Sequence, residues 1–221
     1  MAWFSYFDQK EEITRQFKSS FLYMIFLYAC GIAIWLAWSN PIALYFGLFG
    51  CAINFIVDYF IWYKWWQIRQ IQNVPSPLRF FLLFSVYGIF QFSYAIILFQ
   101  QDLFQIMLFS ALLFLGLYAW GEVSKDYGHE IHISRYISPK HWITRILCVL
   151  GLYLILYFQT LDWMLIGILF GIGCMVELGL EIPLLLNGSR AFYFRQFSLN
   201  ILFEFNLGIP ILYWIYQFVT G

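Results

Sequence analysis

Seven apolar stretches alternate with short polar connections along the chain. Each stretch has about the 20 residues that a helix needs to cross the hydrocarbon core of a bilayer. The stretches cover approximately residues 21–39, 41–63, 80–99, 103–121, 143–159, 163–186 and 199–219. Their length and the lack of a period-two alternation favour helices over barrel strands. The pattern therefore predicts an all-α polytopic membrane protein in which residues 21–221 form a single seven-helix transmembrane domain.

The composition narrows the class of protein further. Hydrophobic residues make up 62% of the 221 residues and charged residues only 11%, whereas a soluble domain has roughly 25% charged residues. The lipid bilayer is therefore an expected partner. Twelve Lys and Arg residues balance twelve Asp and Glu residues, so a nucleic-acid partner is not expected.

The basic residues predict the orientation in the membrane. All twelve lie in the N-terminal segment or in and next to the connections that follow the second, fourth and sixth stretches. The positive-inside rule then places the N-terminus in the cytoplasm and the C-terminus outside. Residues 1–20 place their apolar side chains on one helical face, which predicts a short interfacial helix on the cytoplasmic leaflet. A frayed polar tail is the alternative.

Two of the predicted spans share a pattern. The second contains G-C-x-x-N-x-x-x-D from Gly50 to Asp58, and the sixth contains G-C-x-x-E-x-x-x-E from Gly173 to Glu181, an offset of 123 residues. Two three-helix units joined by a linker helix would place equivalent spans four apart and parallel, as in some transporters. The match therefore indicates a 3+1+3 parallel repeat, with chance similarity of Gly-rich helices as the alternative.

Carboxylates inside the spans are the strongest functional signal. An ionisable side chain within a membrane helix costs several kcal/mol and points to function. Five such groups lie in the half of the spans that is expected to be cytoplasmic: Asp58, Glu122, Glu177, Glu181 and Glu204. A carboxyl group removed from water tends to keep its proton, so it can act as a general acid. Asp58, Glu181 and Glu177 are the candidate catalytic residues, whereas Glu122 and Glu204 are better explained by helix ends or neighbouring helices.

The sequence gives no reason to expect a metal or another cofactor. His129 and His132 lie in a polar connection without a matching set of metal ligands. The chain also lacks an Asp-rich cluster, a Gly-rich phosphate loop and a nucleophile elbow.

Two motifs resemble those of the PaxB-type integral membrane terpene cyclases. They are Asn54-x-x-x-Asp58 and the segment R-x-x-S-x-x-x-W-x-x-R that runs from Arg135 through Trp142 to Arg145. The resemblance implies that a prenylated, lipophilic substrate is protonated at an epoxide or alkene and then cyclised. It places Asp58 in the role of the first acid, Asn54 beside it, and Glu181 or Glu177 in the role of the second acid.

The chain departs from this family at several positions. The first acid is Asp rather than Glu, Val57 occupies a position that is aromatic in the family, and Tyr136 replaces a Gly. Compared with the family, this chain has one helix fewer between the two motifs and one helix more after them. The residues expected to bind the substrate are Asn54, Trp142, Arg145, Arg135, Tyr59 and Glu204.

The aromatic content suits a cyclisation that passes through a carbocation. Phe, Tyr and Trp make up 24% of the chain, and aromatic faces attract cations. Part of this content, the aromatic run from Trp62 to Trp66, is expected to form an interfacial belt. Rings inside the spans, such as Tyr59, are the better candidates for a cavity lining.

Two other classes of function remain open. The repeat plan is similar to that of SWEET and PQ-loop transporters and vitamin carriers, in which Pro183 would be a hinge and Asn54 with Glu177 would contact the solute. A scaffold subunit is the third alternative. A transporter normally places its site near the bilayer midplane, whereas the carboxylates lie toward one leaflet, so the sequence favours the enzyme.

Overall fold

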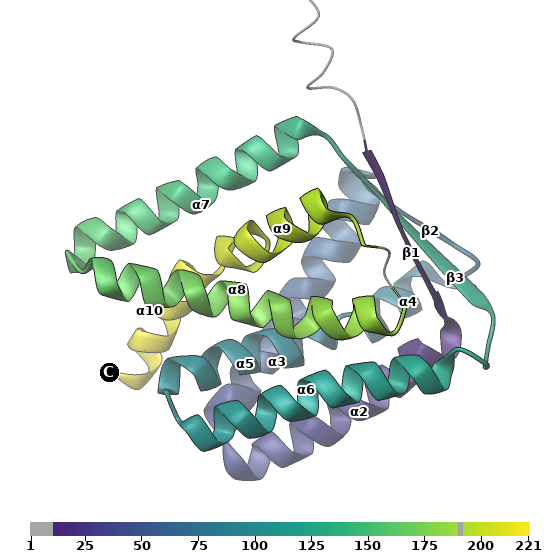
Figure 1. The fold of residues 1–221 in the computed structure, drawn as a ribbon, viewed down its shortest axis with the longest axis horizontal. Coiled ribbons are helices and arrows are strands. Elements are labelled where there is room, and N and C mark those ends of the chain that lie inside the picture. Colours follow the sequence, from purple (N-terminus) through teal and green to yellow (C-terminus); the bar gives the residue numbers. More distant parts are fainter. Residues whose placement is uncertain (1–10, 190–191) are drawn as a thin grey trace, which may run out of the picture. The chain divides into compact units, whose positions relative to one another are not determined.

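The computed structural model describes residues 11–189 and 192–221 (Figure 1). Within these residues, seven helices are long and apolar enough to span a membrane, which confirms the all-α polytopic fold. The helical spans are Ser19–Ser39, Pro41–Trp65, Pro77–Gln100, Leu103–Ser124, Pro139–Thr160, Trp163–Leu186 and Phe197–Thr220. The third and fifth begin a few residues earlier than predicted, each at a proline that suits the first turn of a helix.

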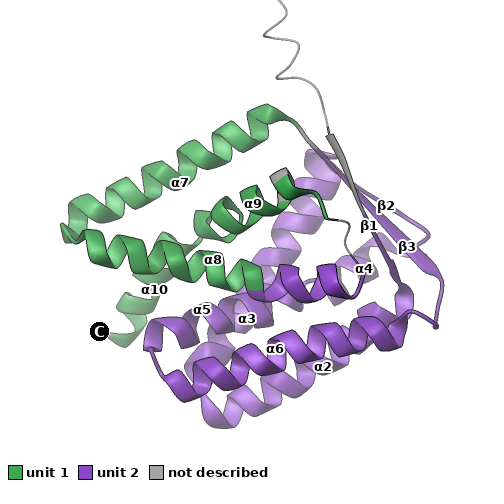
Figure 2. Ribbon diagram, in the orientation of Figure 1, with its two compact units in different colours: residues 1–11, 137–178, 192–221 green, residues 12–136, 179–191 purple. Residues whose placement is uncertain are grey.

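The chain forms two compact units (Figure 2). Beyond residue 11, unit 1 contains residues 137–178 and 192–221, and unit 2 contains residues 12–136 and 179–191. The boundary runs through the sixth span, α8 (Trp163–Leu186), so this helix contributes its first part to unit 1 and its last two turns to unit 2.

Unit 2 contains the first four spans. Its helical elements are α2 (Ser19–Ser39), α3 (Pro41–Phe55), the π-helix η1 (Ile56–Trp65), α4 (Pro77–Phe84), α5 (Tyr87–Gln100) and α6 (Leu103–Ser124). The turn between α2 and α3 is set by Asn40, whose side chain accepts a hydrogen bond from the Ala43 backbone NH at 3.1 Å, with Pro41 in the first turn. Asp102 caps α6 in the same way through Gln105.

Helices α3 and α5 approach each other at glycines. A Cβ atom at Gly88 on α5 would overlap the backbone of Gly50 and Cys51 on α3, and a Cβ at Gly47 would overlap Ser93. Small residues allow such close contact between membrane helices, where packing rather than a hydrophobic driving force holds them together. The Ser93 hydroxyl adds a hydrogen bond to the Ala43 carbonyl at 2.8 Å.

Unit 2 also contains a three-stranded sheet at one end of its helices (Figure 1). Its strands are β1 (Glu11–Lys18), β2 (Arg69–Gln72) and β3 (Glu130–Ile137), in the order β1-β3-β2. Strands β2 and β3 are antiparallel, with Arg69 opposite Arg135 and Ile71 opposite Ile133. The sheet packs on an apolar cluster whose buried members are Leu22, Phe80, Phe81, Ile131 and Ile133.

The interfacial helix predicted for residues 1–20 is wrong for residues 11–18, which form β1. In this strand Phe17 packs against the apolar cluster under the sheet. Pairing with β3 therefore gives these residues both backbone partners and a buried side-chain position, which a helix on the membrane surface would not provide. Residues 1–10 lie outside the described part of the chain.

Unit 1 contains α7 (Pro139–Thr160), the first part of α8, α9 (Phe194–Phe203), the short 3-10 helix η2 (Phe205–Leu207) and α10 (Ile209–Thr220). The last three elements make up the seventh span. At its interruption the Asn206 amide oxygen accepts a hydrogen bond from the Tyr153 hydroxyl of α7 at 2.6 Å. A Cβ at Gly173 of α8 would overlap the Asn206 side chain, so this glycine provides the space that the buried amide needs.

The internal repeat stays a prediction. The third span is interrupted at Ser85 and Val86, and an offset of 123 residues carries position 85 to Gly208, where the seventh span is interrupted. This correspondence favours duplication. The matched second and sixth spans differ, however, because only the second contains a π-helix.

The glycine contact between α3 and α5 gives a first prediction. We expect Gly88→Ala to lower the free energy of unfolding by about 1–3 kcal/mol, the usual effect of overpacking, because the rigid backbone of Gly50 and Cys51 cannot move aside. Thermal unfolding of the purified protein in detergent measures the change. Gly31→Ala on α2 is the matched control, since no atom lies within 4 Å of its added Cβ. Equal melting temperatures for the two variants would contradict the close approach.

Candidate functional site

Several ionisable side chains are buried in the described part of the chain. Asp58, Glu177 and Glu181 are 9%, 4% and 3% exposed, and Arg69 and Arg135 are 7% and 6% exposed. Buried charges require partners of opposite charge or hydrogen bonds, since removing them from water is costly. These groups are therefore the natural place to look for a functional site.

Asp58 forms an ion pair with Arg69. The distance between Asp58 Oδ2 and Arg69 Nη1 is 2.7 Å, and both side chains are largely shielded from solvent. Asp58 lies on η1 at the end of the second span, and Arg69 is the first residue of β2. The pair therefore joins a membrane helix to the sheet.

Arg69 and Arg135 lie opposite each other on neighbouring strands. Like charges in this position repel. The ring of Trp62 lies against both guanidinium groups, with its centroid 4.9 Å from Arg69 Cζ and 4.2 Å from Arg135 Cζ. Both guanidinium groups are attracted to the indole ring by cation–π interaction, and Arg69 is also attracted to the Asp58 carboxylate. These attractions offset the repulsion between the two arginines.

A third arginine and a second acid belong to the same group in unit 2. Arg15 on β1 pairs with Glu181 on α8, and the distance between Arg15 Nη2 and Glu181 Oε1 is 3.6 Å. Burial lowers the pKa of Arg69, Asp58 opposes this effect, and the charges of Arg135 and Arg15 lower the pKa further. Each strand of the sheet thus contributes one arginine to a cluster that contains two of the predicted catalytic acids. We refer to Arg15, Asp58, Trp62, Arg69, Arg135 and Glu181 as the arginine cluster.

Asn54 and Tyr59 have other partners. The Asn54 amide donates a hydrogen bond to Gln91 Oε1 of α5 at 3.0 Å, so it does not share the ion pair of Asp58 as predicted from an α-helical face. The change to a π-helix at Ile56 alters the helical register between the two residues. Tyr59 stacks on Phe55 with a centroid distance of 5.4 Å and packs against the apolar cluster under the sheet.

The remaining predicted residues lie in unit 1. Arg145 Nη1 on α7 is 3.7 Å from Glu204 Oε2 at the end of α9, and its guanidinium lies over the Trp142 ring at 4.8 Å. Glu177, on the part of α8 that belongs to unit 1, is buried. The motif that runs from Arg135 to Arg145 is therefore divided between β3 and the first turns of α7. Its Ser138 caps α7 together with His141.

Sequence reasoning missed Arg15, Arg69 and the role of Trp62. Trp65 and Trp66 are 73% and 60% exposed, as expected for a belt, but Trp62 is partly buried and lies against two arginines. The alternation of polar and apolar residues from Glu130 to Ser134 could have found strand β3, which contains Arg135, but no comparable alternation marks Arg15 or Arg69.

Metal chemistry finds no support in the described residues. They contain no group of three or more His, Cys, Asp or Glu side chains that could hold a metal ion. His132 lies beside Glu130 at 3.7 Å, and Glu130 is also paired with Lys18.

No protein-family model, no curated protein and no solved structure matches this chain.

The ion pair between Asp58 and Arg69 gives a second prediction. We expect Asp58→Asn to lower the free energy of unfolding by about 3–5 kcal/mol, since removing one partner of a buried pair leaves the other charge uncompensated. Arg69→Gln should have a similar effect. The double variant should lose less than the sum of the two single variants, and chemical unfolding in mixed micelles measures all three.

The exposed pair of Glu122 and Lys125, with an Oε1–Nζ distance of 2.6 Å, provides the control. Glu122→Gln should change the free energy of unfolding by less than about 1 kcal/mol, as for other exposed pairs. Strict additivity of Asp58→Asn and Arg69→Gln would show that the two side chains do not interact.

Proposed function

We propose that this chain is a membrane-embedded enzyme of the terpene-cyclase type, which protonates and cyclises a prenylated, lipophilic substrate. The observation that carries the proposal is the burial of three carboxyl groups, Asp58, Glu177 and Glu181, in membrane helices. An ionisable group in such a position is costly and is a functional candidate by default. Acid-initiated cyclisation uses such groups directly and requires neither a metal nor a cofactor.

The distances suggest different roles for the two acids in unit 2. Asp58 is in close contact with Arg69 at 2.7 Å, a position that suits a base or a partner for a developing cation. Glu181 is farther from its arginine, with 3.6 Å between Glu181 Oε1 and Arg15 Nη2. Glu181 is therefore our preferred proton donor in this unit, and Glu177, one helical turn earlier on α8, is the second candidate.

Aromatic side chains close to the arginine cluster support cation chemistry. Phe84 lies 5.8 Å from the Arg69 guanidinium, measured from the ring centroid, and Phe84 in turn contacts Tyr87 at a centroid distance of 5.0 Å. Rings that tolerate a guanidinium can also stabilise a carbocation. A prenyl chain would find apolar surroundings in the same helices.

The proposal predicts the effect of removing each acid. Asp58→Asn and Glu181→Gln should each reduce cyclisation of a prenylated aromatic epoxide by about 100-fold or more, the usual contribution of a general acid or base. Turnover is measured in detergent or nanodiscs by mass spectrometry of the product. Glu122→Gln removes an acid of the same charge from an exposed position and should keep full activity. Each variant is first checked for folding, because Asp58→Asn also breaks an ion pair.

Full cyclisation by both variants would refute the assignment of the acids.

A transporter is the alternative function, and one observation favours it. The third and seventh spans are interrupted at Ser85–Val86 and Glu204–Gly208. Discontinuous helices are common at transporter binding sites. Counterflow of a labelled sugar or vitamin in proteoliposomes, together with no turnover of the epoxide, would support the transporter and contradict the enzyme.

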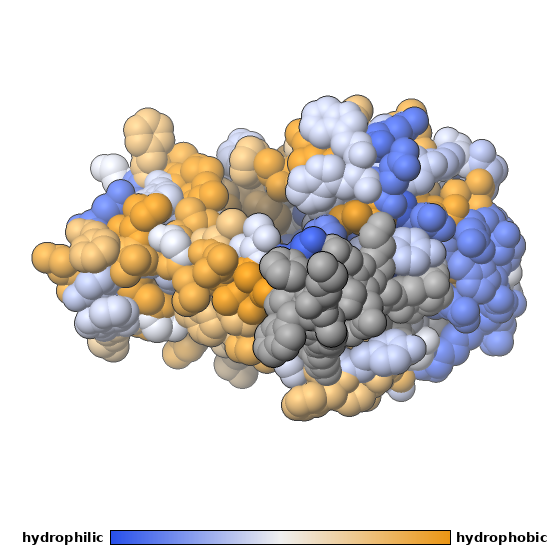
Figure 3. All heavy atoms as spheres, turned by 90° about the horizontal axis from the view of Figure 1, so that it is seen from above, coloured by the Kyte–Doolittle hydropathy of each residue, from blue (hydrophilic) through white to orange (hydrophobic). Residues whose placement is uncertain are grey.

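We further propose that the sheet end of unit 2 faces the cytoplasm, with the N-terminus on that side and residue 221 outside. Hydrophilic residues gather at this end, on the right of Figure 3. The connections at the other end of the same spans, around Asn40 and around Gln101 and Asp102, contain no Lys or Arg. The distribution of positive charge therefore supports this orientation.

Reporter fusions at residue 221 test the orientation in bacteria. Alkaline phosphatase, which is active only outside the cytoplasm, should be active when fused there, and green fluorescent protein should remain dark. Fusions after Lys125 should show the reverse, because Lys125 follows α6 at the sheet end. A fluorescent fusion at residue 221 with inactive phosphatase would reverse the proposed topology.

A further inference from the structure

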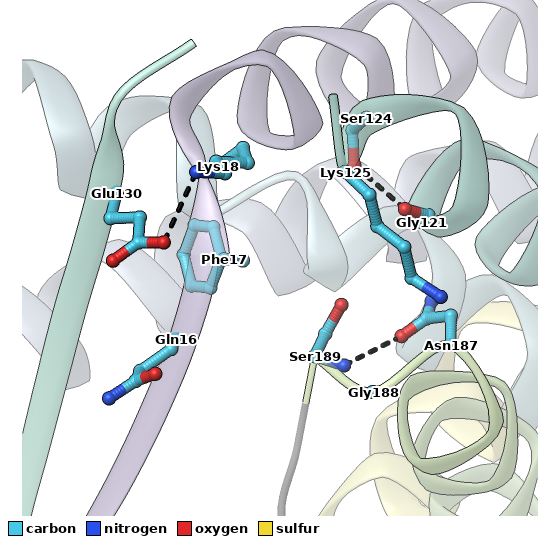
Figure 4. Close-up of a pocket in the computed structure, with 10 residues that line it drawn as sticks. All are labelled: Gln16, Phe17, Lys18, Gly121, Ser124, Lys125, Glu130, Asn187, Gly188 and Ser189. Carbon is cyan, nitrogen blue, oxygen red and sulfur yellow. Dashed lines mark hydrogen bonds and ion pairs between the residues drawn. The ribbon is translucent and has the colours of Figure 1, made fainter. Parts of the chain in front are cut away.

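A polar pocket lies in unit 2 beside the sheet, apart from the residues of the arginine cluster (Figure 4). Its volume is about 270 Å³. The lining comes from β1, from the end of α6, from the start of β3 and from the residues that follow α8. Because α2 begins directly after β1, the pocket lies where three membrane spans, α2, α6 and α8, end at the same side of the unit.

The pocket is lined mainly by groups that can bind an anion, and Glu130 is the one acidic residue of its lining. Lys18 and Lys125 contribute two ammonium groups, and Gln16, Ser124 and Ser189 contribute an amide and two hydroxyl groups. Figure 4 shows Lys125, Asn187 and Ser189 close together on one side of β1, whereas the Gln16 side chain points away from them and Lys18 reaches to Glu130. The apolar part of the lining comes mainly from Phe17, so the pocket suits a charged head group rather than a prenyl chain.

The existing partners of the two lysines can be exchanged. Lys18 Nζ is 3.1 Å from Glu130 Oε1, and Lys125 Nζ is 2.6 Å from Glu122 Oε1. Both pairs are substantially exposed. Exposed pairs of this kind contribute about 0–1 kcal/mol to stability. A phosphate could therefore draw both ammonium groups toward itself at little expense.

The frame of the pocket is rigid where it meets α8. The Asn187 side chain donates a hydrogen bond to the Leu117 carbonyl at 3.0 Å and accepts one from the Ser189 backbone NH at 3.0 Å. Gly121 permits this contact, because a Cβ there would overlap Asn187. Gly188 has a φ of 74°, which turns the chain so that Ser189 faces the pocket. Asn187 and Ser189 are thus held in place before a ligand binds.

From this geometry we infer a phosphate-binding site that receives the head group of an anionic phospholipid at the membrane surface. Basic pockets between membrane helices on the cytoplasmic side bind such head groups. The volume is below the 300–1,000 Å³ typical of sites that enclose a whole drug-sized molecule, which fits a head group whose acyl chains remain in the bilayer. The inference does not depend on the proposed cyclase activity.

Native mass spectrometry of the full chain tests the site, with phosphatidylglycerol as the probe and phosphatidylcholine as the neutral lipid. We expect tighter binding of phosphatidylglycerol. The double variant Lys18→Gln, Lys125→Gln should weaken this binding roughly 25-fold, because each lysine near the surface contributes about a factor of five. The double variant Lys64→Gln, Lys140→Gln is the matched control, since it removes two exposed lysines outside the pocket.

A variant with the opposite sign separates binding from misfolding. Glu130→Gln removes the acid that competes with the ligand for Lys18, so it should strengthen binding of phosphatidylglycerol several-fold, an effect that loss of structure cannot produce. Titration with inorganic phosphate identifies the source of the anion. Competition by millimolar phosphate would indicate that the pocket also accepts the free ion, and lack of competition would indicate that the lipid is required.

Two outcomes would overturn the inference. One is equal binding of phosphatidylglycerol by the wild type and the Lys18→Gln, Lys125→Gln variant. The other is an equal loss of binding in the control double variant, which would show that only the total charge matters. Failure of the cyclase assay has no bearing on either result.

Discussion

The burial of charge at the membrane end is the constraint on which the architecture of unit 2 depends. Arg69 and Arg135 face each other across β2 and β3 and are buried, a placement that is unfavourable unless other groups compensate. Asp58 and Trp62, both on η1, provide that compensation. The sheet is therefore not an independent surface layer. Its strands are attached to the ends of membrane helices through their arginines, and neither the strands nor the π-helix would be well placed without the other.

The helices could be predicted because the bilayer leaves few alternatives. A chain segment in hydrocarbon must satisfy its backbone hydrogen bonds internally, so the position of each apolar stretch almost determines the position of a helix. The interruptions at Ser85–Val86 and Glu204–Gly208 were not predicted. Hydropathy averages over about 20 residues, and a break of a few residues hardly changes that average. The change from α-helix to π-helix at Ile56 was missed because hydropathy does not distinguish the two kinds of helix.

The sheet and the arginine partners could not be predicted from hydropathy. Strand β2 has only four residues, too few for a clear alternation, and β1 resembles an amphipathic helix in composition. The three candidate catalytic acids, Asp58, Glu177 and Glu181, are buried in the structure, and they could be found because a carboxylate inside an apolar stretch is conspicuous. Their partners lie in the polar connections, where an arginine is unremarkable. The contact of Arg15 with Glu181 joins opposite ends of the chain, and only the tertiary fold determines such a pairing.

The difference between the two ion pairs of unit 2 has a chemical consequence. Two carboxyl groups in unequal surroundings can take unequal roles, one as donor and one as acceptor of a proton. A guanidinium beside a carboxyl group stabilises the anion that remains after proton transfer, but a contact that is too close also makes the protonated form rare. The surroundings of the two acids are unequal, because Asp58 lies 2.7 Å from Arg69 and Glu181 lies 3.6 Å from Arg15. An arginine cluster of this kind is therefore compatible with acid-initiated chemistry when it holds one acid tightly and another loosely.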